Sequence, residues 1–373
     1  MITRALTGRI MAGLNGGKAV IILGPRQVGK TTLLKDLFGN DSGTLFLSGD
    51  EQDVRQLFQN ITSTRLKAVI GDKQTLIIDE AQRIDDIGLK LKLIADYIPE
   101  VRLIATGSSS FELASKVNEP LTGRKWEYRM YPLSFGEMVK EHGLLEEKRL
   151  IPHRLVYGSY PEVVTHPGQE KDLLMMLSDS YLYKDILLLD NIKKSSGLTT
   201  LLQALAYQVG SQVSYNELGQ TCGMDAKTVE KYITLLEQCF VVFRLGSFSR
   251  NLRNELKSSK KIYFYDNGIR NAIIADFSQA ESRRDIGALW ENYAISERVK
   301  QNAYTCHWCN SWFWRTKEQS EIDYIEESDG NLSAFEFKWN PGARHRTPSS
   351  FLKAYPGSNL KVITPYNIED FLL

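Results

Sequence analysis

Cysteine is scarce in this chain, net charge is almost absent, and long apolar runs are missing. The 373 residues include 4 cysteines, and 46 basic residues against 45 acidic ones leave a formal net charge of +1. Four cysteines are too few for a disulfide framework, so the composition indicates a cytoplasmic protein. No apolar run approaches the roughly 20 residues of a membrane helix, so we expect no membrane contact. Any nucleic-acid surface must be local, because the chain as a whole is not basic.

The four residues Cys306-His307-Trp308-Cys309 have the spacing of half a zinc site. No second pair of Cys or His residues with metal-ligand spacing follows them. The aromatic, alternating residues around them are typical of a strand. We therefore predict a strand here and no zinc site. The first 17 residues lack the extended apolar core of a signal peptide and are predicted to form a helix.

The run GPRQVGKTT fits the phosphate-binding loop G-x-x-x-x-G-K-[ST]. An apolar run at 19–23 precedes it and predicts a buried strand, and residues 32–38 follow it with a helical pattern. In such a loop, backbone N–H groups and the positive end of the helix surround phosphate oxygens. We expect Lys30 to reach the β- and γ-phosphates and the Thr31 hydroxyl to ligate Mg²⁺. The residues expected to bind ATP are Gly24, Pro25, Arg26, Gln27, Val28, Gly29, Lys30, Thr31 and Thr32.

A second apolar strand, at 75–78, ends in the acids Asp79 and Glu80. In a nucleotide hydrolase, Asp79 would hold Mg²⁺, and Glu80 would orient and deprotonate the attacking water. Two adjacent carboxylates can also cap a helix. The phosphate loop about 50 residues upstream favours the catalytic interpretation.

A third buried strand, at 101–106, ends in Gly107-Ser108-Ser109-Ser110. A hydroxyl at this point can sense the γ-phosphate or the attacking water. A serine here can also be the N-cap of the next helix. We favour sensing for Ser108 or Ser109, and both interpretations stay open for Ser110.

These motifs, with Gly123-Arg124 and the turn Tyr131-Pro132-Leu133-Ser134-Phe135, resemble those of bacterial and archaeal AAA+ ATPases that carry a C-terminal domain of poorly known function. The resemblance implies an α/β fold with a parallel sheet in the order 5-1-4-3-2. It also implies that Arg124 is an arginine finger, which completes the γ-phosphate site of a neighbouring subunit in a ring or other homo-oligomer. The alternative for Arg124 is a surface residue in a β-turn.

The pattern along the chain, together with this resemblance, implies four regions. We expect the ATPase core at 1–135, a helical lid at 136–198, a winged helix at 199–272 and a nuclease-like α/β domain at 273–373. In the third region, helices at 201–209, at 214–220 and from Asp225 precede two alternating strands. Basic residues between or beside these strands could bind DNA phosphates without sequence specificity, or could form a solvated wing on a protein-binding domain. They are Arg250, Arg253, Lys257, Lys260 and Lys261.

The last region contains the pattern D…E-x-K at Asp323, Glu336 and Lys338. Side chains two apart on a strand share a face, so Glu336 and Lys338 can meet Asp323 across a hairpin. Glu291, near the start of a helix, could add a carboxylate. This set resembles the metal-binding site of restriction-endonuclease-like domains. The resemblance implies that Glu291, Asp323 and Glu336 bind Mg²⁺, and that Glu336 and Lys338 are catalytic. The alternative is a solvated strand face with alternating charges.

We therefore expect an ATP-hydrolysing AAA+ protein that uses ATP and Mg²⁺ and acts on DNA, with branched or recombining DNA as a plausible substrate class. The basic segment Arg344-His345-Arg346 and Lys353 could line a DNA groove or begin a solvated helix. One alternative is a nucleotide-gated regulator that binds a protein partner and keeps an inactive nuclease fold. Another is a nuclease that does not depend on ATP.

Overall fold

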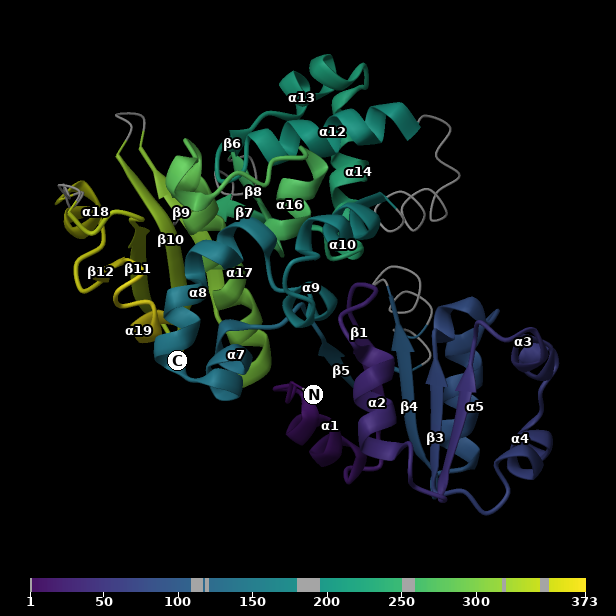
Figure 1. Ribbon diagram of the computed structural model, residues 1–373. Coiled ribbons are helices and arrows are strands. Elements are labelled where there is room, and N and C mark those ends of the chain that lie inside the picture. Colours follow the sequence, from purple (N-terminus) through teal and green to yellow (C-terminus); the bar gives the residue numbers. More distant parts are fainter. Residues whose placement is uncertain are drawn as a thin grey trace. The chain divides into compact units, whose positions relative to one another are not determined.

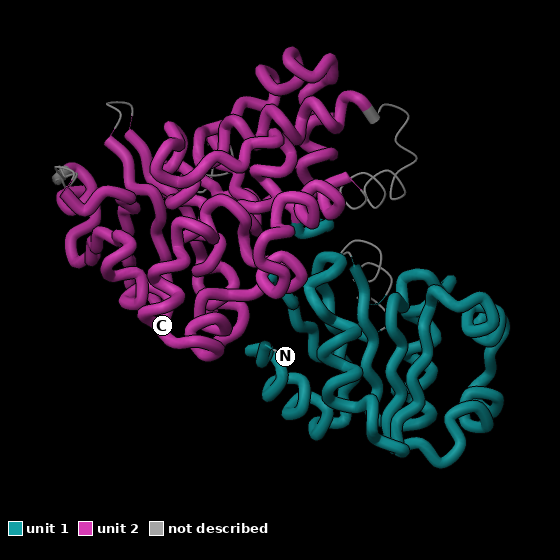
Figure 2. The backbone as a smooth tube through the Cα atoms, viewed as in Figure 1, with its two compact units in different colours: residues 1–132, 238–240 teal, residues 133–237, 241–373 magenta. Residues whose placement is uncertain are grey.

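The structure is a computed structural model, in which the chain forms two compact units (Figure 2). Unit 1 comprises residues 1–132 with 238–240, and unit 2 comprises residues 133–237 and 241–373. The residues that the structure describes are 2–108, 117, 121–179, 195–249, 259–316, 320–342 and 349–373. Several predicted residues lie outside these ranges, namely Ser109, Ser110, Arg250, Arg253, Lys257, Arg344, His345 and Arg346.

Unit 1 is built on a five-stranded sheet in the order β2-β3-β4-β1-β5, and every pair of neighbours is parallel (Figure 1). The expected order 5-1-4-3-2 is therefore confirmed. All residues of β1 and of β3 are buried, which is typical of a parallel strand covered on both faces. The strands are β1 (Ala19–Leu23), β2 (Thr44–Ser48), β3 (Thr75–Asp79), β4 (Arg102–Gly107) and β5 (Lys125–Arg129).

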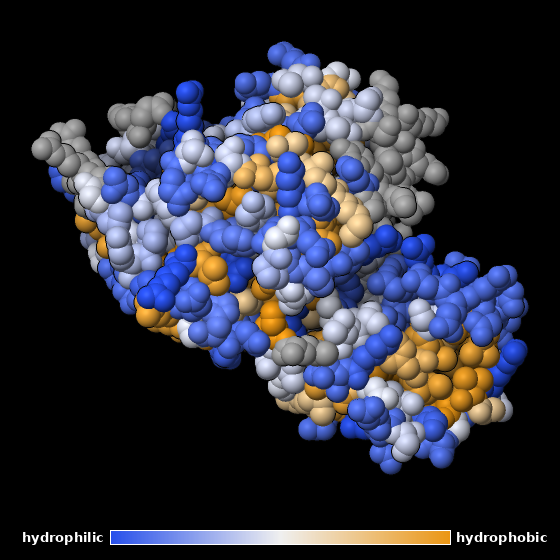
Figure 3. Space-filling model, viewed as in Figure 1, coloured by the Kyte–Doolittle hydropathy of each residue, from blue (hydrophilic) through white to orange (hydrophobic). Residues whose placement is uncertain are grey.

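Helices connect these strands as the sequence pattern indicates. The helix expected at the N-terminus is present as α1. The strand β2 lies at one edge of the sheet and is half-buried along its whole length. Figure 3 shows an apolar area on the visible face of unit 1. The helices are α1 (Thr7–Leu14), α2 (Lys30–Phe38), α3 (Gln52–Gln59), α4 (Ser63–Ile70), the 3₁₀ helix η1 (Ala81–Arg83) and α5 (Ile87–Tyr97).

Unit 2 contains a seven-stranded sheet in the order β12-β11-β10-β9-β7-β8-β6. The strands β7 and β8 form the expected antiparallel pair, and β7 also pairs in parallel with β9. The sheet therefore continues across the boundary that we expected, at residues 272 and 273, between the winged helix and the nuclease-like domain. Its strands are β6 (Gln212–Val213), β7 (Val242–Ser247), β8 (Lys260–Phe264), β9 (Asn310–Arg315), β10 (Glu321–Ser328), β11 (Asn331–Phe337) and β12 (Asn359–Ile363).

Helices of unit 2 fall where the lid, the three-helix segment and the C-terminal region were expected. They are α7 (Phe135–His142), α8 (Leu144–Tyr157), α9 (Pro161–Thr165), α10 (Glu170–Leu177), α12 (Ser195–Tyr207), α13 (Tyr215–Cys222), α14 (Ala226–Gln238), α16 (Asn267–Ile273), η4 (Ala280–Ser282), α17 (Ile286–Thr305), α18 (Ser349–Ala354) and α19 (Glu369–Leu372). No described helix is both long and apolar enough to cross a membrane.

One buried amide fixes the helix α17 against the strand β8. The Oδ1 atom of Asn292 accepts a hydrogen bond from Phe264 N (2.7 Å), and its Nδ2 atom donates to Phe264 O (3.1 Å). Asn292 is fully buried, so losing these bonds would leave unpaired polar groups in the interior. The bonds hold the preceding residue, Glu291, beside the side chains of β8.

Candidate functional site

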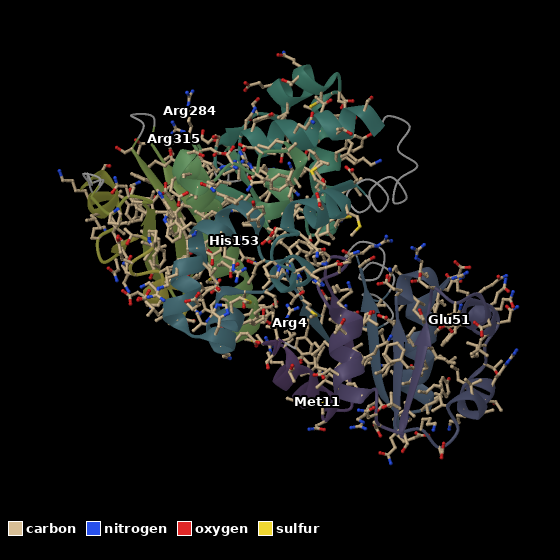
Figure 4. The ribbon with its side chains drawn as sticks, viewed as in Figure 1. Arg4, Met11, Glu51, His153, Arg284 and Arg315 are labelled. Atoms are coloured by element: carbon tan, nitrogen blue, oxygen red, sulfur yellow. The ribbon has the colours of Figure 1, made fainter. Side chains whose placement is uncertain are left out.

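The loop between β1 and α2 has the shape that phosphate binding needs. Gly29 has a φ of +92° and Gln27 a φ of +57°, which turns the backbone into a cradle. A Cβ atom at Gly24 would lie 2.1 Å from the carbonyl oxygen of Met130, so only glycine fits beside the end of β5. Arg4, labelled in Figure 4, donates to Val28 O (2.5 Å) and to Tyr131 O (2.6 Å) and so holds the loop to the chain after β5.

Lys30 lies folded over this loop. Its Nζ atom donates to the carbonyl oxygens of Gly24 and Pro25, each at 2.8 Å, and the residue is 4% exposed. Phosphate oxygens are stronger acceptors for an ammonium group than neutral carbonyls. The ammonium group is therefore already placed where nucleotide phosphates would accept its hydrogen bonds.

Asp79 at the end of β3 lies between two threonine hydroxyls. Thr31 Oγ1 donates to one carboxylate oxygen (2.7 Å), and Thr106 Oγ1 donates to the other. A hydroxyl and a carboxylate at this spacing suit Mg²⁺, which is held in proteins by few protein ligands together with water and phosphate oxygens. The donor set thus fits the expected ion, with Thr31 and Asp79 as the residues that would hold it. Sequence reasoning missed Thr106, which lies on the neighbouring strand β4.

Glu80 is held by a short chain of side chains. Gln82 Nε2 donates to Glu80 Oε2 (2.6 Å) and to Ser108 Oγ (3.0 Å). The predicted sensor Ser108 therefore reaches the predicted catalytic acid through Gln82, which sequence reasoning had not assigned. Glu80 also has a φ of +47°, and non-glycine residues in this conformation cluster at functional sites.

Lys30, Thr31 and Glu80 line a cavity of about 350 Å³ in unit 1. Asp50 and Arg83 also lie in its wall, and nothing in the sequence motif pointed to them. The lining residues are Arg26, Gln27, Gly29, Lys30, Thr31, Thr32, Asp50, Glu80 and Arg83. A larger cavity, of about 720 Å³, lies in unit 2 beside Trp339 and Tyr366, and none of the predicted site residues lines it.

Arg124 lies at the edge of the sheet opposite the phosphate loop. The parallel register pairs Ala19 with Lys125, the first residues of β1 and β5. Arg124 therefore lies at the edge of the sheet where β1 starts, whereas the phosphate loop lies where β1 ends. Five strand residues separate the two edges by about 16 Å. The guanidinium group pairs with Asp96 instead. Arg124 therefore cannot reach the phosphate loop of its own chain.

In unit 2, the structure brings together the four residues of the predicted D…E-x-K site. Lys338 Nζ lies 3.1 Å from Glu336 Oε2 and 3.9 Å from Asp323 Oδ2. Asp323 Oδ2 also accepts a hydrogen bond from Phe337 N (2.8 Å), which fixes the carboxylate between β10 and β11. The helix α17 contributes Glu291, whose charge acts on Lys338 and Asp323.

Two side chains of β8 complete this acidic cluster. Lys261 Nζ lies 3.1 Å from Glu291 Oε1 and 2.6 Å from Glu321 Oε1, and Tyr263 Oη donates to Glu291 Oε1 (2.7 Å). The assignment of Lys261 to an exposed basic patch is therefore wrong, because its side chain is 3% exposed and pairs with two partly buried acids. Alternation along β8 places Lys261 and Tyr263 on one face, a signal that could have been read from the sequence.

The cluster changes the acidity of its members. Burial, with the nearby charge of Asp323, raises the pKa of Glu291 to about 7. Burial also raises the pKa of Asp323. Around Lys261, the carboxylates outweigh burial and raise the pKa of its ammonium group to about 12. At neutral pH, two lysine charges thus face a group of carboxylates in which Glu291 is only partly ionised.

The donor set fits a divalent cation in its chemistry, because carboxylate oxygens are the ligands that Mg²⁺ prefers. Lys261 and Lys338 now neutralise these carboxylates. Among the described residues, three ligand atoms approach within 4.8 Å of one another at a different place, formed by His307, Cys309 and Glu326. Glu326 is already engaged there by Arg298 at 2.7 Å and 2.9 Å, so this second group is a poor metal site.

Comparison with protein families supports the assignment of unit 1. Residues 16–139 match the family model described as an AAA domain. This part of the chain is therefore similar to an AAA domain. Residues 148–280 and 286–368 match two further models, each described as a domain of unknown function.

The relatives are uncharacterized proteins. One from Mycobacterium tuberculosis is 26% identical over 351 residues, which cover 93% of this chain and 75% of that protein. Among solved structures, a signal-transduction ATPase with a tetratricopeptide repeat sensor from Pyrococcus horikoshii has 12% identity and a TM-score of 0.31, and the match covers 81% of this chain and 45% of that one. AMPPCP-bound DnaA from Aquifex aeolicus has 17% identity and a TM-score of 0.27, with 61% of this chain and 86% of that one covered.

The raised pKa of Glu291 predicts how the stability of unit 2 depends on pH. Between about pH 4.5 and pH 7, folded Glu291 keeps its proton while the unfolded chain loses it, so the free energy of unfolding falls as pH rises. Glu291→Gln removes this titration and should flatten the fall. Denaturant unfolding followed by tryptophan fluorescence reports mainly unit 2, which contains five of the six tryptophans.

The matched control is Glu281→Gln, which replaces an exposed glutamate of the same unit. This variant should keep the wild-type pH dependence. If the free energy of unfolding fell equally with rising pH in wild type and in Glu291→Gln, the raised pKa of Glu291 would be contradicted.

Proposed function

We propose that this protein hydrolyses ATP as an AAA+ oligomer and acts on DNA through a metal-dependent, nuclease-like site in unit 2. One observation carries the ATPase part of the proposal, namely that the Asp79 carboxylate, held between Thr31 and Thr106, binds Thr31 in the wall of the cavity that Lys30 and Glu80 also line. Catalysis of phosphoryl transfer depends almost entirely on positioning and charge, and these groups supply both.

The residues in the cavity wall and beside it have distinct roles in this proposal. Backbone N–H groups of the loop and the Lys30 ammonium bind the phosphates. Thr31 and Asp79 would hold Mg²⁺, which would offset the charge that develops on the phosphate oxygens. Glu80 accepts a proton from the attacking water, and Gln82 orients the Glu80 carboxylate by the hydrogen bond of 2.6 Å. Ser108 links the same glutamine to the end of β4.

The DNA part of the proposal rests on the convergence of Glu291, Asp323, Glu336 and Lys338 from three elements. Here Asp323, Glu336 and Glu291 would hold a divalent cation, which supplies charge neutralisation at a phosphodiester. Lys338 would orient the attacking water or stabilise negative charge on the phosphate. The three helices α12, α13 and α14 with the pair β7–β8 are consistent with a winged helix that engages DNA.

Assembly into a homo-oligomer is supported by the position of Arg124. Because its guanidinium lies at the sheet edge opposite the phosphate loop of its own chain, an arginine-finger role requires a neighbouring copy. The ion pair with Asp96 is half-exposed, and such surface pairs contribute only about 0–1 kcal/mol, so the arginine is available to another partner.

The cluster in unit 2 also favours a second candidate, a nucleotide-gated regulator that binds a protein partner and keeps an inactive nuclease fold. Lys261 and Lys338 already neutralise the carboxylates, as basic residues do where buried acids are only structural. In this alternative, the cluster stabilises the sheet, and ATP hydrolysis controls contact with the partner.

Metal-dependent cleavage separates the two candidates. Wild type with Mg²⁺ or Mn²⁺ should cut at least one of linear, forked and four-way DNA. Glu336→Ala and Lys338→Ala should each lower the cleavage rate by about a hundredfold, because each removes a charge from the reacting centre. Gel analysis of end-labelled DNA measures this rate.

The matched controls are Glu327→Ala and Lys361→Ala, which alter the same sheet outside the acidic cluster. They should cut at the wild-type rate. Wild type that cuts none of the three substrates with either ion would contradict the nuclease function and favour the regulator.

Action of Arg124 in a neighbouring subunit predicts complementation. Arg124→Ala should keep ATP binding and lower hydrolysis about a thousandfold, because a finger stabilises charge in the transition state. Mixing it with Lys30→Ala, which is inactive for lack of phosphate binding, should restore hydrolysis, since the second chain supplies Arg124 to the intact loop of the first. Steady-state phosphate release measures hydrolysis by Arg124→Ala and by the mixture. A mixture no more active than either variant alone would contradict the arginine-finger role of Arg124.

A further inference from the structure

An ion pair without an assigned role lies in the wall of the nucleotide cavity. Arg83 Nε lies 3.4 Å from Asp50 Oδ1, and both residues line the cavity together with Thr31 and Glu80. Thr31 and Glu80 mark the end of the cavity where Mg²⁺ and the attacking water would lie. The guanidinium of Arg83 therefore lies on the side of the terminal phosphate.

The backbone around this pair is built with close contacts. Arg83 ends the 3₁₀ turn η1, three residues after Glu80. Gly49 lies against this turn, because a Cβ atom there would meet Glu80 O at 2.4 Å and Arg83 Cβ at 3.2 Å. Gly49 N also donates to Asp79 O (2.8 Å). The residue before Asp50 is thus fixed directly beside the acids of β3.

The backbone of Asp50 is anchored while its side chain stays accessible. Arg55 donates to the carbonyl oxygens of Gly49 (2.8 Å) and Asp50 (2.7 Å). The side chains of Arg83 and Asp50 are 43% and 63% exposed, so solvent screens their attraction. The Arg83 guanidinium can therefore readily leave Asp50 for a partner that binds it more strongly. A phosphate offers one, because its oxygens accept parallel hydrogen bonds from the planar guanidinium.

Arg124 cannot take this place within its own subunit, since it lies at the opposite edge of the sheet. Among the described residues that line the cavity, Arg83 on η1 carries the guanidinium group that lies outside the phosphate loop. Arg83 is carried by the same turn as Glu80, so its distance from the terminal phosphate is set by the backbone that places the catalytic acid.

We propose that Arg83 binds the terminal phosphate of a nucleoside triphosphate within its own chain. In the absence of this phosphate, the guanidinium group stays paired with Asp50. This inference rests on the proposed ATPase function and adds a residue that distinguishes triphosphate from diphosphate. A diphosphate has no group at this position, so Arg83 stays with Asp50 when ADP is bound.

Calorimetric titration of the full chain with ADP and with a non-hydrolysable ATP analogue, both with Mg²⁺, tests the proposal. Arg83→Ala should weaken binding of the analogue about tenfold or more and leave ADP binding within about twofold, as expected for the loss of a hydrogen bond between charged groups. Arg83→Lys should recover part of the loss. Asp50→Asn should tighten binding of the analogue about two- to fivefold, because the competing partner is gone.

The matched control is Arg65→Ala, which removes an exposed arginine from α4 of the same unit and should change neither affinity. Equal affinities of Arg83→Ala and wild type for the analogue would overturn the role of Arg83, as would equal weakening for both nucleotides. A wild type that binds neither nucleotide would overturn the proposed ATPase itself, which is a different result.

Discussion

The hydrogen bonds of the Asp79 carboxylate hold the nucleotide cavity together. One oxygen accepts from Thr31 on α2 and the other from Thr106 on β4, so a single side chain ties the loop helix to two neighbouring strands. The parallel order of the sheet makes this possible, because β3, β4 and β1 end at the same edge. Glu80 joins this network because its backbone N–H donates to Thr106 Oγ1 (3.1 Å), and Gln82 links the Glu80 carboxylate to Ser108, so the groups for magnesium binding and proton transfer are positioned together.

A similar constraint organises unit 2. Buried Asn292 bonds to the backbone of Phe264 and so aligns α17 with β8, which brings Glu291 to Tyr263 and Lys261. Asp323 and Glu336 join from β10 and β11. Arg315 on β9, labelled in Figure 4, approaches Glu321 at 3.6 Å and adds a further cation at the edge of the cluster. The acidic site therefore combines Lys261 and Tyr263, from the region expected to form a winged helix, with residues of the region expected to be nuclease-like.

The sequence was sufficient to predict the parts of the fold with strong local signals. The phosphate loop, the buried strands around it and the sheet order could be predicted because glycine positions, apolar runs and a family resemblance agreed. The pattern at Asp323, Glu336 and Lys338 predicted a convergence that the structure contains. Groups that depend on contacts between distant strands could not be found in this way. Strand order brings Thr106 to Asp79, and a close turn at Gly49 brings Asp50 and Arg83 to the cavity wall, neither of which a linear spacing encodes. Lys261 was misplaced because its basic neighbours in sequence suggested an exposed patch, whereas its position on β8 turns it into the acidic cluster.

The central claim is that the cavity around Asp79 hydrolyses ATP with Glu80 as the proton acceptor. Paired measurement of ATP binding and ATP turnover in Glu80→Gln tests it most directly, because this change keeps the size of the side chain and removes its basicity. We predict that binding stays within about twofold of wild type while turnover falls by at least about a hundredfold, the usual contribution of a general base. Turnover equal to that of wild type, or a wild type that binds ATP without turning it over, would contradict the account.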